Sequence, residues 1–215
     1  TGSTSLTDPG SGNRISYLIR SFGGDNTTVR KNVLAFGSFT GVQLSSASNN
    51  WTIQNNQILD IGLGNDNSDG IAIGDSNNTL ISGNRITGTS TQAIIASGTS
   101  SGTTIENNTV SNNGIGAIGN TPVQNDAIAF RGTTGGGSIY RNVITGNYGA
   151  GVTVNNGATG VLISQNEIWG NGTITSRNGS AATGIVGIDL QNATDNNQIG
   201  TAPFFTLNDT GDADT

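Results

Sequence analysis

One six-residue pattern recurs along the chain and constrains its fold more than any other feature. It consists of an apolar residue, two variable residues, asparagine, one variable residue and a second apolar residue, as in Ile53–Ile58. The shared asparagines are Asn32, Asn56, Asn84, Asn108, Asn142 and Asn166. Three of the five intervals between them are equal, and the second and fourth are longer. Such a period indicates a solenoid with a base unit of about 24 residues and insertions in some units.

A second pattern precedes each asparagine from the second repeat on: a small residue followed by an alternating apolar segment. These segments are Gly41–Leu44, Gly70–Ile73, Ala93–Ala96, Ala127–Phe130 and Gly151–Val154, and Gly187–Leu190 follows the last asparagine. Alternation places one side of each strand in a core and the other in solvent. Because such a unit cannot bury its own apolar face, it must stack on its neighbours. We therefore predict an all-β, single-stranded parallel β-helix of about seven coils over residues 13–200; right-handedness is expected from crossover sterics.

The repeated asparagines are expected to form a ladder. We predict that each occupies a turn with left-handed backbone angles, which asparagine tolerates, and that its amide bonds the amide of the next coil. This structural role is favoured over a ligand role. Removal of one ladder asparagine in the middle of the stack should cost about 1 to 3 kcal/mol.

Composition excludes several classes of function. The chain carries eight Lys and Arg against fourteen Asp and Glu, a net charge of -6, so it lacks the basic clusters that nucleic acid binding requires. Cysteine and histidine are absent, which removes disulfides, thiolate or histidine metal sites and Ser-His-Asp chemistry. No apolar run approaches the roughly 20 residues of a membrane span, so no membrane insertion is expected.

With its six asparagine repeats, the chain resembles the parallel β-helix repeat family of bacterial extracellular proteins, which includes pectate-lyase-like enzymes and many large surface proteins. The resemblance implies an extracellular or cell-surface location. The acidic segment 208–215, NDTGDADT, resembles the end of the repeat region in bacterial surface β-helix proteins. We expect residues 1–12 to be an extension or cap, residues 201–215 to be an acidic tail, and the protein to continue into neighbouring domains.

The insertions point to one side of the solenoid. The stretch from the ladder asparagine to the next strand has the same short length after Asn32, Asn84 and Asn142. It is longer after Asn56, Asn108 and Asn166, and the last of these three is the longest. All three insertions should therefore emerge at one corner and form a wall beside a strand face, where functional residues tend to concentrate. Drift at a tolerant turn explains the same lengths equally well.

Two insertions end in acids, which are candidate catalytic residues. Asp69 and Asp126 occupy the same position in their coils, with Gln92 between them. A separation of two coils is roughly 9 to 10 Å, near the upper range for the carboxylates of an inverting glycosidase. Asp189 is a third candidate, and it should point outward from its strand. Capping of the turns by these carboxylates is the favoured alternative.

Candidate ligand and metal residues also lie on or near the insertions and in the tail. Trp169 should face outward beside the longest insertion, whereas Trp51 should pack in the core or at the edge of a coil. Tyr140 and Tyr148 are further candidates for exposure. Hard oxygen ligands suit calcium, although neither acidic cluster has the spacing of an EF-hand. The ligand-binding candidates are Trp169, Gln124, Asn125, Arg131 and Arg177, and the candidate calcium ligands are Asp66, Asp69, Asp209, Asp212 and Asp214.

Two functions remain open from the sequence. A non-catalytic module of a bacterial surface or secreted protein, acting in adhesion or carbohydrate binding, requires only the scaffold and its loops, and we favour it. The alternative is a polysaccharide lyase or glycoside hydrolase. The calcium acids and Arg or Lys base of the pectate-lyase-like mechanism cannot be matched residue by residue, because the one lysine, Lys31, and most arginines lie beside the ladder.

Overall fold

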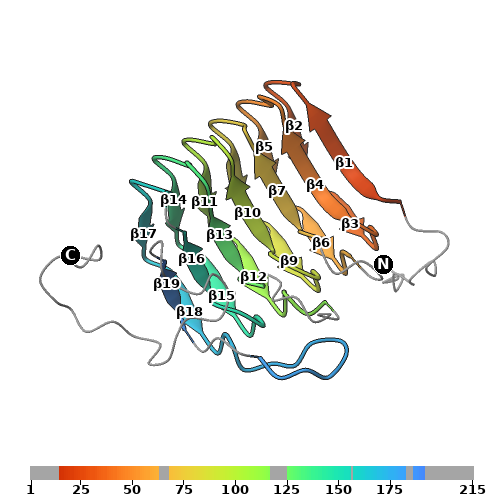
Figure 1. Ribbon diagram of the computed structural model, residues 1–215. Coiled ribbons are helices and arrows are strands. Elements are labelled where there is room, and N and C mark those ends of the chain that lie inside the picture. Colours follow the sequence, from red (N-terminus) through yellow and green to blue (C-terminus); the bar gives the residue numbers. More distant parts are fainter. Residues whose placement is uncertain (1–14, 63–67, 117–124, 156, 183–185, 192–215) are drawn as a thin grey trace, which may run out of the picture.

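The protein is a parallel β-solenoid (Figure 1). The computed structural model describes residues 15–62, 68–116, 125–155, 157–182 and 186–191. Within these ranges the chain forms three sheets of seven, six and six strands, and every strand pairs in parallel with the equivalent strand of the next coil. The predicted all-β solenoid is thus confirmed. No segment of the described ranges forms a helix that could span a membrane.

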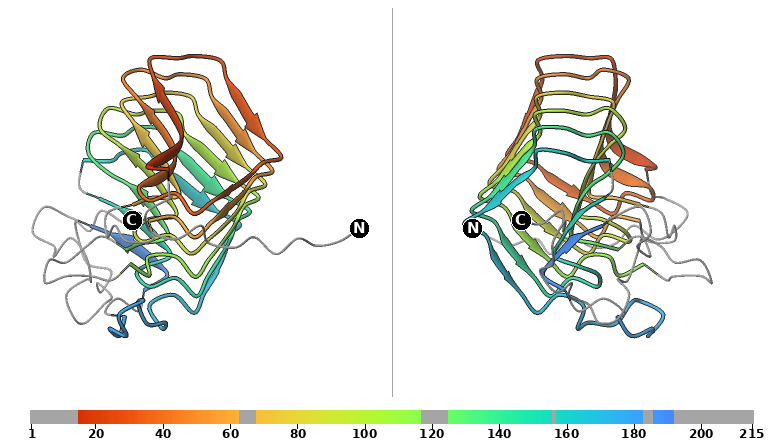
Figure 2. Two further views of the ribbon diagram at one scale, coloured as in Figure 1. Left: turned by 90° about the vertical axis from the view of Figure 1, so that its right-hand side faces the viewer. Right: turned by 60° about the vertical axis from the view of Figure 1, so that its left-hand side comes forward.

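Each of the first six coils contributes one strand to each sheet, the last described coil contributes β19 alone, and the coils stack along a common axis (Figure 2). Sheet A contains β1 (Tyr17–Phe22), β4 (Thr40–Ser45), β7 (Ile71–Gly74), β10 (Ile94–Ser97), β13 (Ile128–Phe130), β16 (Val152–Val154) and β19 (Ile188–Leu190). Sheet B contains β2 (Thr28–Arg30), β5 (Thr52–Gln54), β8 (Leu80–Ser82), β11 (Thr104–Glu106), β14 (Ser138–Tyr140) and β17 (Leu162–Ser164). Sheet C contains β3 (Val33–Ala35), β6 (Gln57–Leu59), β9 (Arg85–Thr87), β12 (Thr109–Ser111), β15 (Val143–Thr145) and β18 (Glu167–Trp169).

Columns of like apolar residues form the core, because register repeats from coil to coil. In sheet B, Ile53 lies next to Ile81, and the column continues through Ile105 and Ile139, all fully buried. Sheet C stacks an equivalent column that includes Ile58 and Ile86. Each residue is therefore enclosed by its neighbours above and below as well as across the coil.

In sheet A the side chains of the column vary in size, and a glycine just before β14 of sheet B leaves room for the largest of them. Ile73, Ala96 and Phe130 follow one another in the column. The Phe130 ring is 1% exposed, and a Cβ at Gly137 would lie 2.2 Å from its Cε1. Because that distance is well inside van der Waals contact, only glycine fits there without a shift of the ring.

The predicted asparagine ladder runs along the corner between sheets B and C. Each of the first five ladder asparagines donates from its backbone N and its Nδ2 to the Oδ1 of the next ladder residue; for Asn84 and Asn108 the distances are 2.8 and 3.0 Å. The Nδ2 of Asn108 also donates to the carbonyl of Ile81 in the preceding coil, at 2.9 Å. The four central asparagines, Asn56, Asn84, Asn108 and Asn142, are at most 2% exposed.

The predicted left-handed angle at the ladder asparagine is wrong, because the residue before it carries that angle. The preceding residues Lys31, Asn55, Gly83, Asn107, Arg141 and Gln165 have φ between 54° and 66°, and no ladder asparagine has a positive φ. One left-handed residue turns the chain from sheet B to sheet C, and the asparagine that follows then points inward. Its recurrence is explained by hydrogen bonding along the stack.

A second asparagine ladder lies at the corner between sheets C and A, and the sequence analysis missed it. Asn113 Nδ2 donates to Asn147 Oδ1 at 3.0 Å, and Asn147 Nδ2 donates to Asn171 Oδ1 at 2.8 Å. All three side chains are at most 5% exposed. Thr89 continues the series, since its Oγ1 and backbone N both donate to Asn113 Oδ1 at 3.2 Å. The signal was present in the sequence, because each of these asparagines follows a ladder asparagine at the same short interval.

The three insertions emerge at this same corner, as predicted. They follow β6, β12 and β18, and each leads from sheet C to sheet A. The longest insertion folds back over earlier coils: Arg177 donates from Nη1 to Ser90 Oγ at 2.7 Å, and from its backbone N to Ile115 O at 2.8 Å. Tyr148, expected to be exposed, is 5% exposed because this insertion covers it, and its hydroxyl donates to Ala181 O at 2.6 Å.

Candidate functional site

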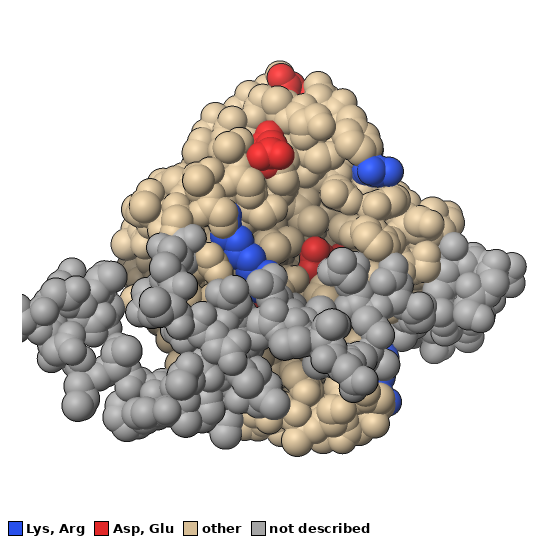
Figure 3. All heavy atoms as spheres, viewed as in Figure 1, with Lys and Arg blue, Asp and Glu red and all other residues tan. Residues whose placement is uncertain are grey.

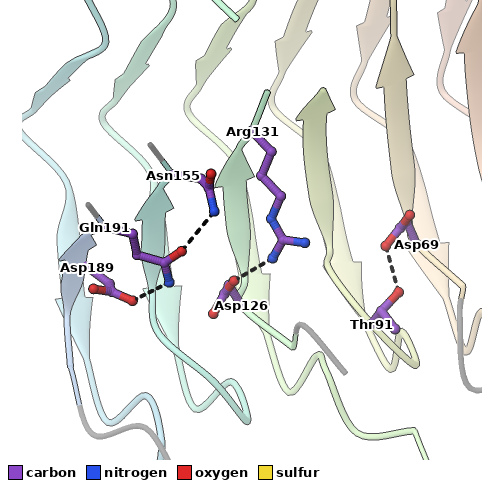
Figure 4. A network of polar contacts seen from close by, with 7 residues as sticks. All are labelled: Asp69, Thr91, Asp126, Arg131, Asn155, Asp189 and Gln191. Carbon is purple, nitrogen blue, oxygen red and sulfur yellow. Dashed lines mark hydrogen bonds and ion pairs between the residues drawn. The ribbon is translucent and has the colours of Figure 1, made fainter. Parts of the chain in front are cut away.

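Polar side chains gather on the outward face of sheet A, over its last strands. The register places Ala129, Thr153 and Asp189 side by side on β13, β16 and β19. Directly after the last two of these strands, Asn155 Nδ2 donates to Gln191 Oε1 at 3.0 Å. Gln191 Nε2 in turn donates to Asp189 Oδ2 at 2.7 Å, so one continuous set of hydrogen bonds crosses this part of the sheet (Figure 4).

An ion pair between Asp126 and Arg131 borders this set. Arg131 follows β13 and its guanidinium reaches back toward the start of the strand, where Nη2 lies 2.9 Å from Asp126 Oδ2 (Figure 4). The two side chains are 2% and 12% exposed. Burial raises the pKa of Asp126, and the charge of Arg131 and its hydrogen bond oppose that rise. Asp126 therefore forms a buried ion pair, a contact that the sequence did not predict.

Asp69 lies on the other side of Arg131, two coils from Asp126. It is partly buried, and its Oδ1 accepts a hydrogen bond from Thr91 Oγ1 at 2.6 Å. Burial raises the pKa of Asp69 to about 6, although the Thr91 hydrogen bond and the positive charge of Arg131 lower it. Arg131 acts electrostatically on both Asp69 and Asp126, so the two acids share one cation.

The titration of Asp69 leads to a prediction about stability. Its pKa of about 6 in the folded protein exceeds its ordinary value of 3.8, so the folded state binds more protons between these values. The contribution of Asp69 to the free energy of unfolding is therefore greatest below about pH 4 and falls as pH rises through about 6. In urea denaturation at pH 4 and pH 7, Asp69→Asn should be stabilising at pH 7 and near neutral at pH 4. Equal effects at both values would contradict this assignment.

Several buried polar atoms beside the ion pair have no hydrogen-bond partner within the described ranges. They are Arg131 Nε and both amide atoms of Asn125. Buried polar atoms in folded proteins are nearly always paired, so a cluster of unpaired ones marks a place where a polar ligand or water can bind. Asn125, predicted from the sequence as a ligand-binding residue, is 3% exposed and immediately precedes Asp126.

Other predicted site residues lie elsewhere. Arg177 holds the longest insertion against earlier coils, as described above. Trp169 faces outward, as expected, and is 52% exposed, but it lies on sheet C. Trp51 is 6% exposed, in agreement with its predicted packing role. Outside the described residues lie Asp66, Gln124, Asp209, Asp212 and Asp214.

The predicted calcium ligands are thus represented only by Asp69 among the residues that the structure describes. Across those residues no three acidic side chains come close enough together to hold a metal ion. Charged side chains are also sparse on the face shown in Figure 3. Each described acid of the site has a protein partner instead. Asp69 accepts a hydrogen bond from Thr91, Asp126 forms an ion pair with Arg131, and Asp189 accepts a hydrogen bond from Gln191.

Four of these polar residues were missed by the sequence analysis: Thr91, Thr153, Asn155 and Gln191. Asn155 and Gln191 directly follow alternating strands, at the position that Arg131 occupies after β13. A polar residue at this position in three successive coils was a signal that comparison of the strand ends alone could have found. For Thr153, the alternation of its strand predicted only that its side chain points away from the core.

The geometry defines a class of protein: a β-solenoid that presents a polar patch on one sheet, bordered by loops. The comparisons agree with this class. A family model described as a right-handed β-helix region matches residues 11–168, and the chain therefore belongs to the right-handed β-helix family. No curated protein and no solved structure matches the chain.

Proposed function

We propose that this β-helix is a non-catalytic module of a bacterial surface or secreted protein, and that it binds a neutral carbohydrate on the outward face of sheet A. The observation that carries the proposal is the polar patch formed by Asp126, Arg131, Asn155, Asp189 and Gln191. Amide, guanidinium and carboxylate groups can each donate to or accept from sugar hydroxyls. The unpaired Nε of Arg131 and the amide of Asn125 add further capacity.

Charge favours a neutral glycan over a polyuronate. Asp69 and Asp126 share a single cation, Arg131, and Asp189 adds a further negative charge that acts on Asp126. The chain as a whole has a net charge of -6. A carboxylated polysaccharide would meet like charges at this face, which lowers its rate of association and its affinity. We infer further that the module acts outside the cell and is joined to neighbouring domains, in keeping with its resemblance to surface β-helix proteins.

The test is a binding screen by isothermal titration calorimetry with a panel of neutral and acidic polysaccharides. We expect neutral members to bind, and Asn155→Ala combined with Gln191→Ala to weaken binding about tenfold or more, since each lost hydrogen bond contributes about 1 kcal/mol. The control is Gln57→Ala, because Gln57 is an exposed amide on β6 of sheet C. Binding restricted to polyuronates, or unchanged in the double variant, would overturn the proposal.

A glycoside hydrolase is the second candidate, and the raised pKa of Asp69 supports it. A carboxyl group with a pKa of about 6 remains partly protonated near neutral pH and can act as a general acid. The same polysaccharide panel is assayed for new reducing ends. Turnover that is lost in Asp69→Asn and in Asp126→Asn, with both variants folded, would replace the binding role with catalysis.

A further inference from the structure

Exposed basic residues gather along the corner between sheets B and C, beside the first asparagine ladder. Arg30 ends β2, and Lys31 follows it directly. Arg85 begins β9, and Arg141 follows β14. All four side chains are exposed, and the proposed function uses none of them. The remaining described basic residues lie elsewhere in the fold: Arg20, Arg131 and Arg177.

Three of these residues form a row parallel to the axis of the solenoid. Lys31 and Arg141 each hold the left-handed position before a ladder asparagine, with φ of 57° and 54°. Arg85 directly follows the ladder residue Asn84. They belong to the first, fifth and third coils, so neighbouring cations are two coils apart, about 9 to 10 Å. A compact anion can therefore contact one of them well, whereas an extended chain can contact all three.

Neutral polar side chains occupy the same positions on the coils between the cations. Asn55 of the second coil and Asn107 of the fourth hold the left-handed position that Lys31 holds in the first. Gln57 and Thr109 lie beside Arg85 in the register of sheet C. All four of these neutral side chains are exposed. Cationic and neutral coils thus alternate along the corner.

The charges of this row are not neutralised by the protein. Within the described residues, no acidic side chain pairs with Arg30, Lys31, Arg85 or Arg141. The Nε of Arg141 donates instead to the neutral Oε1 of Gln165, at 3.0 Å. These cations are therefore available to an external anion.

Two acids lie near the row, and neither interrupts it. Glu106 lies on β11 between Ser82 and Tyr140, and its carboxylate accepts hydrogen bonds from the hydroxyls of both. Glu167 lies in the sixth coil, beyond the last cation. Acids farther away than a Debye length, about 8 Å at physiological ionic strength, are largely screened. The corner is thus locally positive in a protein whose net charge is -6.

We propose that the corner between sheets B and C binds a linear acidic polysaccharide that runs parallel to the solenoid axis and carries an acid on every second sugar. Lys31, Arg85 and Arg141 each contact one carboxylate, and Arg30 adds charge at the first coil. The exposed amides and hydroxyl of the second and fourth coils face the neutral sugars and can bond their hydroxyls. This surface is separate from the polar patch on sheet A.

The test is calorimetric titration of the full chain with hyaluronan oligosaccharides, in which glucuronate alternates with a neutral sugar. We expect binding that weakens as salt is added. Free glucuronate should bind at least about tenfold more weakly, because it cannot contact several cations at once.

The triple variant Lys31→Asn, Arg85→Gln and Arg141→Asn should weaken binding of the oligosaccharides about tenfold or more, since an exposed ion pair contributes about two- to fivefold. Each new residue is one that an adjacent coil carries at the equivalent position, so the coil geometry is retained, and thermal unfolding verifies this. Arg20→Gln is the control for lost charge, because Arg20 is an exposed arginine on β1 of sheet A. It should leave binding unchanged.

Four results would overturn the proposal: no binding at low salt, unchanged binding in the triple variant, an equal loss in Arg20→Gln, or tighter binding of polygalacturonate, which has an acid on every sugar. Asn155→Ala combined with Gln191→Ala should leave hyaluronan binding intact. The triple variant should likewise leave binding of a neutral glycan intact. The two surfaces can therefore fail independently.

Discussion

Replacing Asn108 with alanine is expected to lower the free energy of unfolding by about 3 to 5 kcal/mol, because several buried groups lose partners together. The Oδ1 of Asn108 accepts from both the backbone N and the Nδ2 of Asn84. Its Nδ2 donates to Ile81 O and to Asn142 Oδ1. This expected loss exceeds the roughly 1 to 3 kcal/mol expected for a single unsatisfied amide, and urea denaturation at constant pH measures it.

Asn32→Ala is the matched control for this substitution. Asn32 is the first ladder asparagine and is exposed, and it donates to Asn56 without accepting from a ladder residue of an earlier coil. Its loss should cost less than about 1 kcal/mol. If Asn108→Ala and Asn32→Ala lowered stability equally, hydrogen bonding along the stack would not explain the recurrence of asparagine.

Replacing Arg131 with methionine should also be strongly destabilising at neutral pH, by about 3 to 5 kcal/mol. Methionine retains an apolar chain of similar reach but leaves the Asp126 carboxylate, which is 2% exposed, without its counter-charge. Combining Arg131→Met with Asp126→Asn removes the unpaired charge, so the double variant should recover most of the lost stability.

The pH dependence of the stability of Arg131→Met tests whether its destabilisation comes from lost charge. Arg131 is the largest influence that lowers the pKa of Asp126, so without it burial and the charge of Asp189 raise that pKa further than in the intact protein. The folded variant then takes up a proton as pH falls, so its stability relative to the intact protein should improve below neutral pH. Denaturation curves at pH 5 and pH 7 measure this. A cost that does not change with pH would show that the side chain matters for packing instead of charge.

The sequence predicted the coil organisation because the fold is built from local repetition. Asparagines that recur at one regular interval identify stacked coils, and strands such as Gly151–Val154 identify the inward side. The hydrogen-bonded ladder was predicted correctly, but the residue with the left-handed φ angle was not. Two adjacent residues turn the chain, and the sequence alone does not separate the left-handed angle of Asn107 from the inward direction of Asn108.

The candidate site was less predictable because it depends on distance along the stack and on cover by loops. The shared position of Asp69 and Asp126 followed from spacing alone. Their burial, and the raised pKa values that result, depend on packing that no single coil encodes. The pairing of Asp126 with Arg131 was also missed, because their separation along an extended strand does not by itself suggest contact.

The most direct test of the proposed function is an NMR titration of isotope-labelled protein with the neutral oligosaccharide that binds best in the polysaccharide panel. We predict that chemical-shift changes concentrate on the side-chain amides of Asn155 and Gln191, the Arg131 guanidinium and the backbone of β16 and β19. Changes centred on Trp169 and sheet C, or no changes with any neutral member of the panel, would contradict the assignment of the binding surface to sheet A.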